Sequence, residues 1–193
     1  MAGGLILDYS SDRIQHLGGA VTGNFITSHI GYGKKYSSMD KDKKLRDAEY
    51  VTGAFFATRY LLFKSVGGFD TGYRPAYFEE LDYCIKAGKL GLRTVVNPLA
   101  VARHFEGASV KKFSRNFYKY YHKNRIRCAL LNLSFGRLCK DFFISELRWL
   151  KNKATGDQAA PLLYGYFLNI LLLPFNLAIK LKNHLFLNGL GLK

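Results

Sequence analysis

The sequence has few cysteines, and their spacing argues against two classes of small protein. Cys84, Cys128 and Cys139 make three in all, an odd number with no Cys-x-x-Cys pair. A disulfide framework needs an even set, and a structural zinc cluster needs paired spacing. We therefore expect neither, and the composition fits a reducing compartment such as the cytoplasm.

The first residues lack the features of a secretory signal peptide. Residues 1–8 carry no basic residue, and their apolar run, Leu5 to Leu7, is three residues long. A signal peptide has a basic start followed by an apolar stretch of roughly 7–15 residues. We therefore expect no export.

Acidic residues are scarce in the second part of the chain. Residues 1–106 hold 14 Lys or Arg against 11 Asp or Glu, whereas residues 107–193 hold 15 against 3, and the net charge is +15. Such a basic segment attracts phosphate groups, whether of anionic lipid, nucleotide or nucleic acid. We expect a nearly neutral globular part, residues 1–109, followed by a basic helical tail, residues 110–193.

The globular part alternates short apolar runs with helical patterns, as α/β proteins do. Apolar and β-branched runs predict strands, and apolar residues at helical spacing before a glycine predict helices. The strands are expected at residues 4–7, 50–57, 94–98 and 99–103, and the helices at residues 59–65 and 79–87. Residues 22–49 are expected to form a long surface loop. The order predicts an α/β layer with its loops at one sheet edge.

The tail is expected to be helical and to contain one long apolar segment. Residues 111–133 combine an aromatic stripe with many cations, and residues 142–150 continue this pattern. Residues 161–179 carry no charge, and a segment of this length can span a membrane. Four residues interrupt this segment: Gly165, Asn169, Pro174 and Asn176. We favour an interfacial or re-entrant hairpin on an anionic membrane surface; the alternative is a buried core helix or an oligomer contact.

Three carboxylates crowd the start of the second predicted helix. Glu79, Glu80 and Asp82 lie where the amides of a helix point outward, and this placement stabilises negative charge without any function. His104 ends the following extended segment, where an ordinary strand-end histidine would lie. Spacing alone therefore favours a structural role for all four.

The order of these motifs carries more information than their spacing. Val51-Thr-Gly-Ala54 and Val66-Gly-Gly-Phe-Asp70 precede the carboxylates, and His104 follows them. This series resembles the acceptor side of family 2 glycosyltransferases, such as rhamnosyl- and galactofuranosyltransferases, over about residues 5–130. The resemblance implies a partial, Rossmann-like GT-A sheet layer. It also implies inverting transfer of a sugar from a nucleotide-sugar donor to a glycan or lipid-linked glycan, as in cell-wall or polysaccharide synthesis.

The resemblance implies catalytic roles for the carboxylates. In the family, the second acid of a Phe-Glu-Asp-Val-Asp pattern takes the proton from the acceptor hydroxyl, and here that acid is Glu80, a glutamate in place of the usual aspartate. A glutamate can act as the same base, because the two reference pKa values are close. Glu79 would then orient the acceptor, and Asp82 would support the loop through hydrogen bonds.

The resemblance also implies binding roles. His104 matches a histidine that helps to hold the divalent metal, Mn²⁺ or Mg²⁺, at the donor diphosphate. Arg125, in Tyr-Tyr-His-Lys-Asn-Arg, would pair with the diphosphate, although a basic helix lying on anionic lipid would show the same pattern. Gly53, within a predicted strand, indicates close approach of a ligand to the backbone.

The family's nucleotide-binding half, which ends in an Asp-x-Asp motif on a strand, is not recognisable in this sequence. Asp40-Lys-Asp42 matches the motif literally, but no apolar strand precedes it, so solvated loop charges are the simpler interpretation. We expect an acceptor-side portion that is inactive alone, with the metal ligands in a missing or separately encoded N-terminal half. The alternative is a non-catalytic basic module for anionic membranes or nucleic acid. The apolar segment beside the charge argues against nucleic acid.

Overall fold

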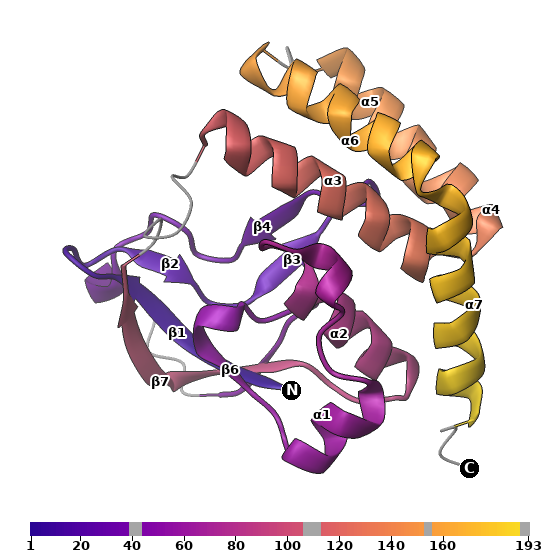
Figure 1. Ribbon diagram of the computed structural model, residues 1–193. Coiled ribbons are helices and arrows are strands. Elements are labelled where there is room, and N and C mark those ends of the chain that lie inside the picture. The colour runs from indigo at the N-terminus through magenta and orange to yellow at the C-terminus, as the bar shows by residue number, and fades with distance from the viewer. Residues whose placement is uncertain (39–43, 106–112, 153–155, 190–193) are drawn as a thin grey trace. The chain divides into compact units, whose positions relative to one another are not determined.

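The computed structural model describes residues 1–38, 44–105, 113–152 and 156–189 (Figure 1). It has a mixed α/β architecture, as the sequence predicts. The chain divides into two compact units, which we describe separately. Unit 1 is Met1–Ala20, Thr27–Asp70 and Glu80–Ala108, and unit 2 is Val21–Ile26, Thr71–Glu79 and Ser109–Lys193. The Asp40-Lys-Asp42 segment lies outside the described residues.

Unit 1 contains a five-stranded mixed sheet. Its central strands, β1 (Ala2–Asp8) and β7 (Val95–His104), are parallel. Three short strands pair antiparallel with these two: β2 (Ile14–His16) and β6 (Phe56–Ala57) with β1, and β5 (Arg46–Asp47) with β7. A second, two-stranded sheet joins β3 (Gly19–Val21) and β4 (Thr27–His29). The predicted loop at residues 22–49 therefore contains short strands.

The central strand pair is close-packed and irregular at one point. A methyl group at Gly4 would lie 2.3 Å from the backbone oxygen of Ala100, so this position has no room for a side chain. Gly4 pairs with Asn97, but the next residue, Leu5, pairs with Val101. Residues 98–100, which include the proline, therefore bulge out of the ladder. The two predicted extended segments are one strand broken at the proline.

The helices of the first half begin and end where the sequence predicts, within two residues. Helix α1 (Tyr60–Val66) ends at Gly67, which has a φ of 95° and caps the helix as only glycine does without strain. Helix α2 (Glu79–Lys89) contains the three carboxylates. Its Tyr83 packs with Val66 and Ala87 in a core that also contacts the partly buried aromatic residues Phe56 and Phe63.

The predicted strand at residues 50–57 is largely wrong. Residues Gly53–Phe55 form a 3₁₀ turn, η2, and only Phe56 and Ala57 join the sheet. Tyr50 makes a single bridge to Gly19. Side-chain packing overrides strand propensity here, because Val51 is completely buried against Gly3.

Unit 2 is mostly helical. Its main helix, α3 (Arg115–Asn132), begins at Ser114, whose hydroxyl accepts a hydrogen bond from the Phe117 amide at 3.1 Å. A π-helical segment, η4 (Leu138–Phe143), lies between two further helices, α4 (Phe135–Arg137) and α5 (Ile144–Asn152). Two apolar helices follow: α6 (Ala159–Leu171) and α7 (Leu173–Gly189).

Helix α6 runs along α3, as Figure 1 shows. A methyl group at Gly165 would lie 3.0 Å from the backbone carbon of His122, so glycine permits this close approach of the two helices. The chain bends by 69° at the break between α6 and α7. Among the described helices, none is both long and apolar enough to cross a membrane by itself, although this bent pair meets the length and composition required.

Candidate active site

Glu80 lies beside the turn formed by η2. Its Oε1 atom accepts a long hydrogen bond, 3.4 Å, from the backbone amide of Gly53. Nothing in the described chain would contact a methyl group at Gly53 within 4 Å, so the backbone is open on that side. The structure thus brings together two of the residues that the sequence singles out, the candidate base and the glycine expected to approach a ligand.

Glu79 is the first residue of α2, and burial raises the pKa of its carboxyl group. Its Oε2 atom is buried and accepts no hydrogen bond from the described residues. A carboxyl group in such surroundings holds its proton more readily than one in water. Glu79 can therefore donate a hydrogen bond as well as accept one, which suits a group that orients a hydroxyl.

Asp82 is completely buried and paired within its own helix. Its Oδ2 atom lies 2.6 Å from Nζ of Lys86, one turn further along α2, and the Lys86 side chain is also buried. Both charges are thus removed from water and depend on each other. This pair supports the helix; the loop-supporting role predicted for Asp82 stays a prediction.

The two residues before the carboxylates have a rare backbone conformation. Tyr77 and Phe78 have φ values of 78° and 79°, in the left-handed region that aromatic residues seldom adopt. Each such residue costs on the order of 1–3 kcal/mol and persists only where its surroundings impose it. The Tyr77 ring packs against Phe117 and the Phe78 ring against Tyr121, with ring centroids 5.1 and 5.3 Å apart.

His104 lies at the end of β7, in parallel register with Asp8 at the end of β1. Gln15 joins the two strand ends. Its amide nitrogen donates to the His104 carbonyl at 2.9 Å and more weakly to Asp8 Oδ2 at 3.4 Å, while its amide oxygen lies 3.1 Å from His104 Nδ1. Hydrogen bonds from the hydroxyls of Ser11 and Ser10 lower the pKa of Asp8. Sequence reasoning missed Asp8, because only the parallel pairing brings it to the histidine.

The described residues do not form a metal site by themselves. No group of three His, Cys, Asp or Glu side chains among them could hold a metal ion. Asp8 and His104 would supply two ligands, whereas Mn²⁺ and Mg²⁺ prefer about six. The metal-binding role of His104 stays a prediction.

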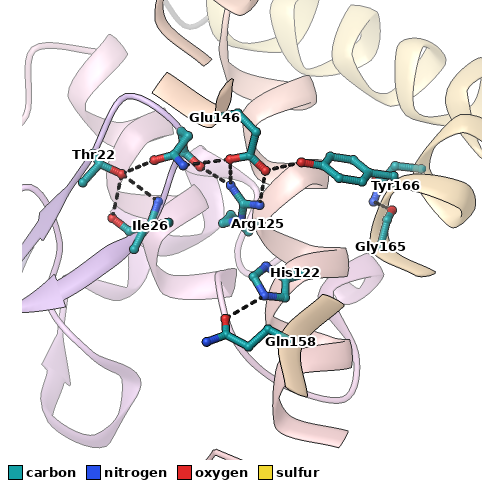
Figure 2. Close-up of polar contacts among 10 residues, drawn as sticks. Thr22, Ile26, His122, Arg125, Glu146, Gln158, Gly165 and Tyr166 are labelled. Atoms are coloured by element: carbon teal, nitrogen blue, oxygen red, sulfur yellow. Dashed lines mark hydrogen bonds and ion pairs between the residues drawn. The ribbon is translucent and has the colours of Figure 1, made fainter. Parts of the chain in front are cut away.

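Arg125 occupies the interior of unit 2 (Figure 2). Its Nη1 and Nη2 atoms donate to the two carboxylate oxygens of Glu146 at 2.8 and 2.7 Å, and Nη1 also donates to the Asn24 carbonyl at 2.6 Å. Its Nε atom is buried as well. Arg125 thus has a structural role, as the buried partner of Glu146, and its predicted role as a phosphate ligand stays a prediction.

The surroundings of Glu146 keep it ionised. Burial by itself would raise the pKa of this carboxyl group, but hydrogen bonding and charge from Arg125 outweigh burial and lower it. Asn24 donates to Glu146 at 2.7 Å, and the Tyr166 hydroxyl also donates to it. Burial and the Glu146 carboxylate raise the pKa of Tyr166. Glu146 therefore collects donors from three other segments of unit 2.

Comparisons with known proteins place this geometry in context. No family model matches the chain. The sequence is 26% identical over 129 residues to Rhamnosyltransferase WbbL of Escherichia coli (strain K12), a match that covers 63% of this chain and 48% of that protein. The chain thus spans about half the length of the curated relative.

A solved structure also resembles the chain. The crystal structure of GalNAc-T7 with UDP, GalNAc and Mn²⁺ matches 84% of this chain and 31% of its own, with a TM-score of 0.51 and 16% identity. At this identity the likeness concerns the fold. The two comparisons confirm the resemblance drawn from the sequence: the chain has a partial GT-A fold and is similar to part of a glycosyltransferase.

Proposed function

We propose that the chain is the acceptor-side part of an inverting family 2 glycosyltransferase. It would transfer a sugar from a nucleotide-sugar donor to a glycan or lipid-linked glycan. The observation that carries the proposal is the placement of Glu80 at the start of α2 beside the open backbone of Gly53. The GT-A-like fold and the rhamnosyltransferase relative support it.

Glu80 is the general base in this proposal. Its carboxylate takes the proton of the acceptor hydroxyl while the acceptor oxygen bonds to the anomeric carbon of the donor sugar. The bond from that carbon to the diphosphate oxygen breaks, and the nucleoside diphosphate leaves with the electron pair. Glu79, whose pKa is raised by burial, holds the acceptor oxygen in line through a hydrogen bond.

A divalent cation, Mn²⁺ or Mg²⁺, would neutralise the departing diphosphate when bound. Among the described residues, only Asp8 and His104 would contribute to its ligands, and no group of three is present. We therefore propose that the donor, the metal and most of the metal ligands belong to a nucleotide-binding half, encoded separately or elsewhere in the same gene. The purified 193-residue chain with Mn²⁺ should then neither hydrolyse nor transfer a nucleotide sugar, and robust turnover would exclude this part of the proposal.

The test of the base uses the chain co-expressed with a nucleotide-binding half. The substrates are a panel of nucleotide sugars that includes nucleotide-linked rhamnose, together with lipid-linked oligosaccharide acceptors. Glu80→Gln should lower kcat by about 10²-fold or more, the usual contribution of a general base, and leave donor binding unchanged. Glu49→Gln, at an exposed position of the same unit, is the matched control. Full activity of Glu80→Gln would refute the base assignment.

We also propose that unit 2 attaches the protein to the inner, cytoplasmic face of a membrane. Helices α6 and α7 expose large apolar side chains that nothing in the described chain covers: Leu163, Phe167, Ile170, Leu171, Phe175 and Leu185 are each 59–72% exposed. The 15 Lys and Arg of residues 107–193 would favour an anionic lipid surface. A lipid-linked acceptor would then lie at the surface where the enzyme is bound, and we expect no nucleic-acid partner.

A further inference from the structure

The segment before α2, residues 73–79, is held in a conformation that its own sequence disfavours. We call it the acid loop, because it ends at Glu79. Its left-handed residues Tyr77 and Phe78 are both aromatic, and neither has the conformational freedom of glycine. Interactions from outside the loop must therefore impose this backbone conformation.

A single buried side chain on α3 binds the carbonyl groups of the acid loop. Asn124 is completely buried, and its amide nitrogen lies 2.6 Å from the Tyr73 oxygen, 2.7 Å from the Ala76 oxygen and 3.0 Å from the Tyr77 oxygen. An amide group has two hydrogens for these three acceptors, so at least one hydrogen is shared. A side chain without a donor would remove all three of these hydrogen bonds.

The neighbouring residues of α3 bind the same loop. Nζ of Lys123 donates to the Arg74 carbonyl at 2.6 Å, and the guanidinium of Arg127 lies 5.4 Å from the centre of the Tyr73 ring. Phe117, Tyr121 and Asn124 follow one another at intervals of four and three residues, so they share one face of the helix. That face contacts the loop from Tyr73 to Phe78.

We propose that Asn124 is a positioning residue for Glu79, the first carboxylate of α2. By holding the Tyr73, Ala76 and Tyr77 carbonyls it fixes the left-handed pair and thereby the backbone of Glu79, the residue that follows this pair. Its importance for catalysis rests on the proposed transferase function. Its effect on the loop does not, and the two are tested by different measurements.

The loop is tested on the 193-residue chain by hydrogen exchange. Asn124→Ala should accelerate amide exchange in peptides covering residues 71–79 about tenfold or more, since three loop carbonyls lose the hydrogen bonds that Asn124 donates. Peptides from α5 should keep the wild-type rate. Asn132→Ala is the matched control, because Asn132 lies on the same helix and donates to the Cys128 carbonyl of that helix. Unchanged loop exchange in a folded Asn124→Ala protein, or equal acceleration by the control, would overturn the proposal.

A spectroscopic readout separates positioning from a general loss of packing. In the wild type, the carboxyl carbon of Glu79 should titrate above the range of an exposed glutamate in a ¹³C NMR experiment, with Glu79→Gln identifying the signal. Asn124→Ala should return the titration toward that range, because an open loop hydrates the carboxyl group. A Glu79 titration that stays unchanged while the loop opens would show that Asn124 does not position this residue.

A second variant, Asn124→Asp, has the same shape as the wild type. At neutral pH, however, its carboxylate can only accept hydrogen bonds, so it cannot bind the three loop carbonyls. Loop exchange should then be faster than in the wild type at pH 7, and this difference should shrink near pH 4, where the introduced carboxyl group regains a proton to donate. If neither variant unfolds cooperatively, Asn124 stabilises the whole unit and the proposal of a local role is wrong.

In the co-expressed enzyme, Asn124→Ala should lower kcat by about tenfold or more with little change in the donor KM. A wild type without turnover would refute the proposed function and leave the loop result standing.

Discussion

Arg125 and Glu146 form a bidentate ion pair in the interior of unit 2, with both N–H···O distances at 2.7–2.8 Å. The Arg125 side chain has no exposed surface, and that of Glu146 is 4% exposed. The ring of Trp149 lies 5.5 Å from the same guanidinium. The pair thus joins α3 to α5, and the hydrogen bonds of Asn24 and Tyr166 extend it to residues 21–26 and to α6.

Removing one member of this pair should destabilise the protein strongly. Arg125→Met leaves the Glu146 carboxylate buried without its counter-charge, which typically costs about 3–5 kcal/mol. The free energy of unfolding, measured by urea denaturation, should fall by this amount. Arg137→Met is the matched control: its pair with Asp141 is exposed, so a change of about 0–1 kcal/mol is expected. Equal effects of the two substitutions would contradict a structural role for Arg125.

The buried histidine His16 should make stability depend on pH. Burial, and to a smaller extent the charge of His29, lowers the pKa of His16 to about 3. An unfolded histidine binds a proton below about pH 6.5, so between these values the unfolded state binds more protons than the folded state. The free energy of unfolding should therefore fall by about 1 kcal/mol per pH unit as the pH drops from 6.5 toward 3.

Two variants isolate the contribution of His16. His16→Phe keeps a ring in the same space but cannot be protonated, so the slope of the unfolding free energy between pH 6.5 and 4 should decrease. His184→Gln, at an exposed position of α7, should leave the slope unchanged. His122, whose pKa burial lowers to about 4, should supply part of the slope that remains in His16→Phe. An unchanged slope in His16→Phe would show that the imidazole titrates normally in the folded protein.

Local chemistry explains why some elements could be predicted and others could not. Helix α1 was predictable because its apolar spacing and the following Gly67 fix its end within the segment itself. Helix α2 was predictable from its apolar spacing, but it continues through Gly88, the glycine expected to end it, to Lys89. The strand predicted at residues 50–57 fails because a run of branched and aromatic residues also fits a single buried residue, Val51, followed by a surface turn. Packing of Val51 against β1, which the sequence does not show, decides between them.

The candidate site was predictable only where its residues are close in sequence. Glu79 and Glu80 were found from an ordered motif, whereas Asn124 binds carbonyls 47 to 51 residues earlier in the chain. Arg125 was interpreted through its chemistry, since arginine suits phosphate as well as carboxylate. The scarcity of acidic residues in the tail could have indicated the ion pair. Glu146 is one of only three acids among residues 107–193, so few carboxylates there could pair with a buried arginine.

Substitutions of Asp82 and Glu80 should have different effects: the first should lower stability, and the second should lower the rate of sugar transfer. Asp82→Asn removes the partner of a buried lysine and should lower the free energy of unfolding by about 3 kcal/mol or more. Pairing it with Lys86→Met should recover much of this loss. At a temperature where the protein is folded, kcat in the co-expressed enzyme should stay within about tenfold of the wild type, in contrast to Glu80→Gln. A loss for Asp82→Asn as large as that of Glu80→Gln would give Asp82 a direct catalytic role.

The apolar surface of α6 and α7 should bind lipid vesicles. Each of Phe167, Ile170 and Phe175 is more than half exposed, and burying such a side chain contributes about 1.5–3 kcal/mol. The variant with all three changed to serine should therefore bind vesicles of phosphatidylcholine and phosphatidylglycerol with an affinity lower by about 10²-fold or more, as measured by flotation. The control is Phe135→Ser, which removes a side chain that is 82% exposed on α4.

The lipid composition and the oligomeric state distinguish a membrane surface from an oligomer contact. Binding of the wild type should weaken in vesicles of phosphatidylcholine alone and at high salt, because both remove the attraction between the basic tail and anionic headgroups. If these helices instead bind a second copy of the chain, the triple serine variant would change from dimer to monomer in analytical ultracentrifugation, and wild-type protein would not float. An oligomer contact would bury the same apolar side chains. The triple serine variant therefore supports membrane attachment only if it loses flotation while its oligomeric state stays that of the wild type.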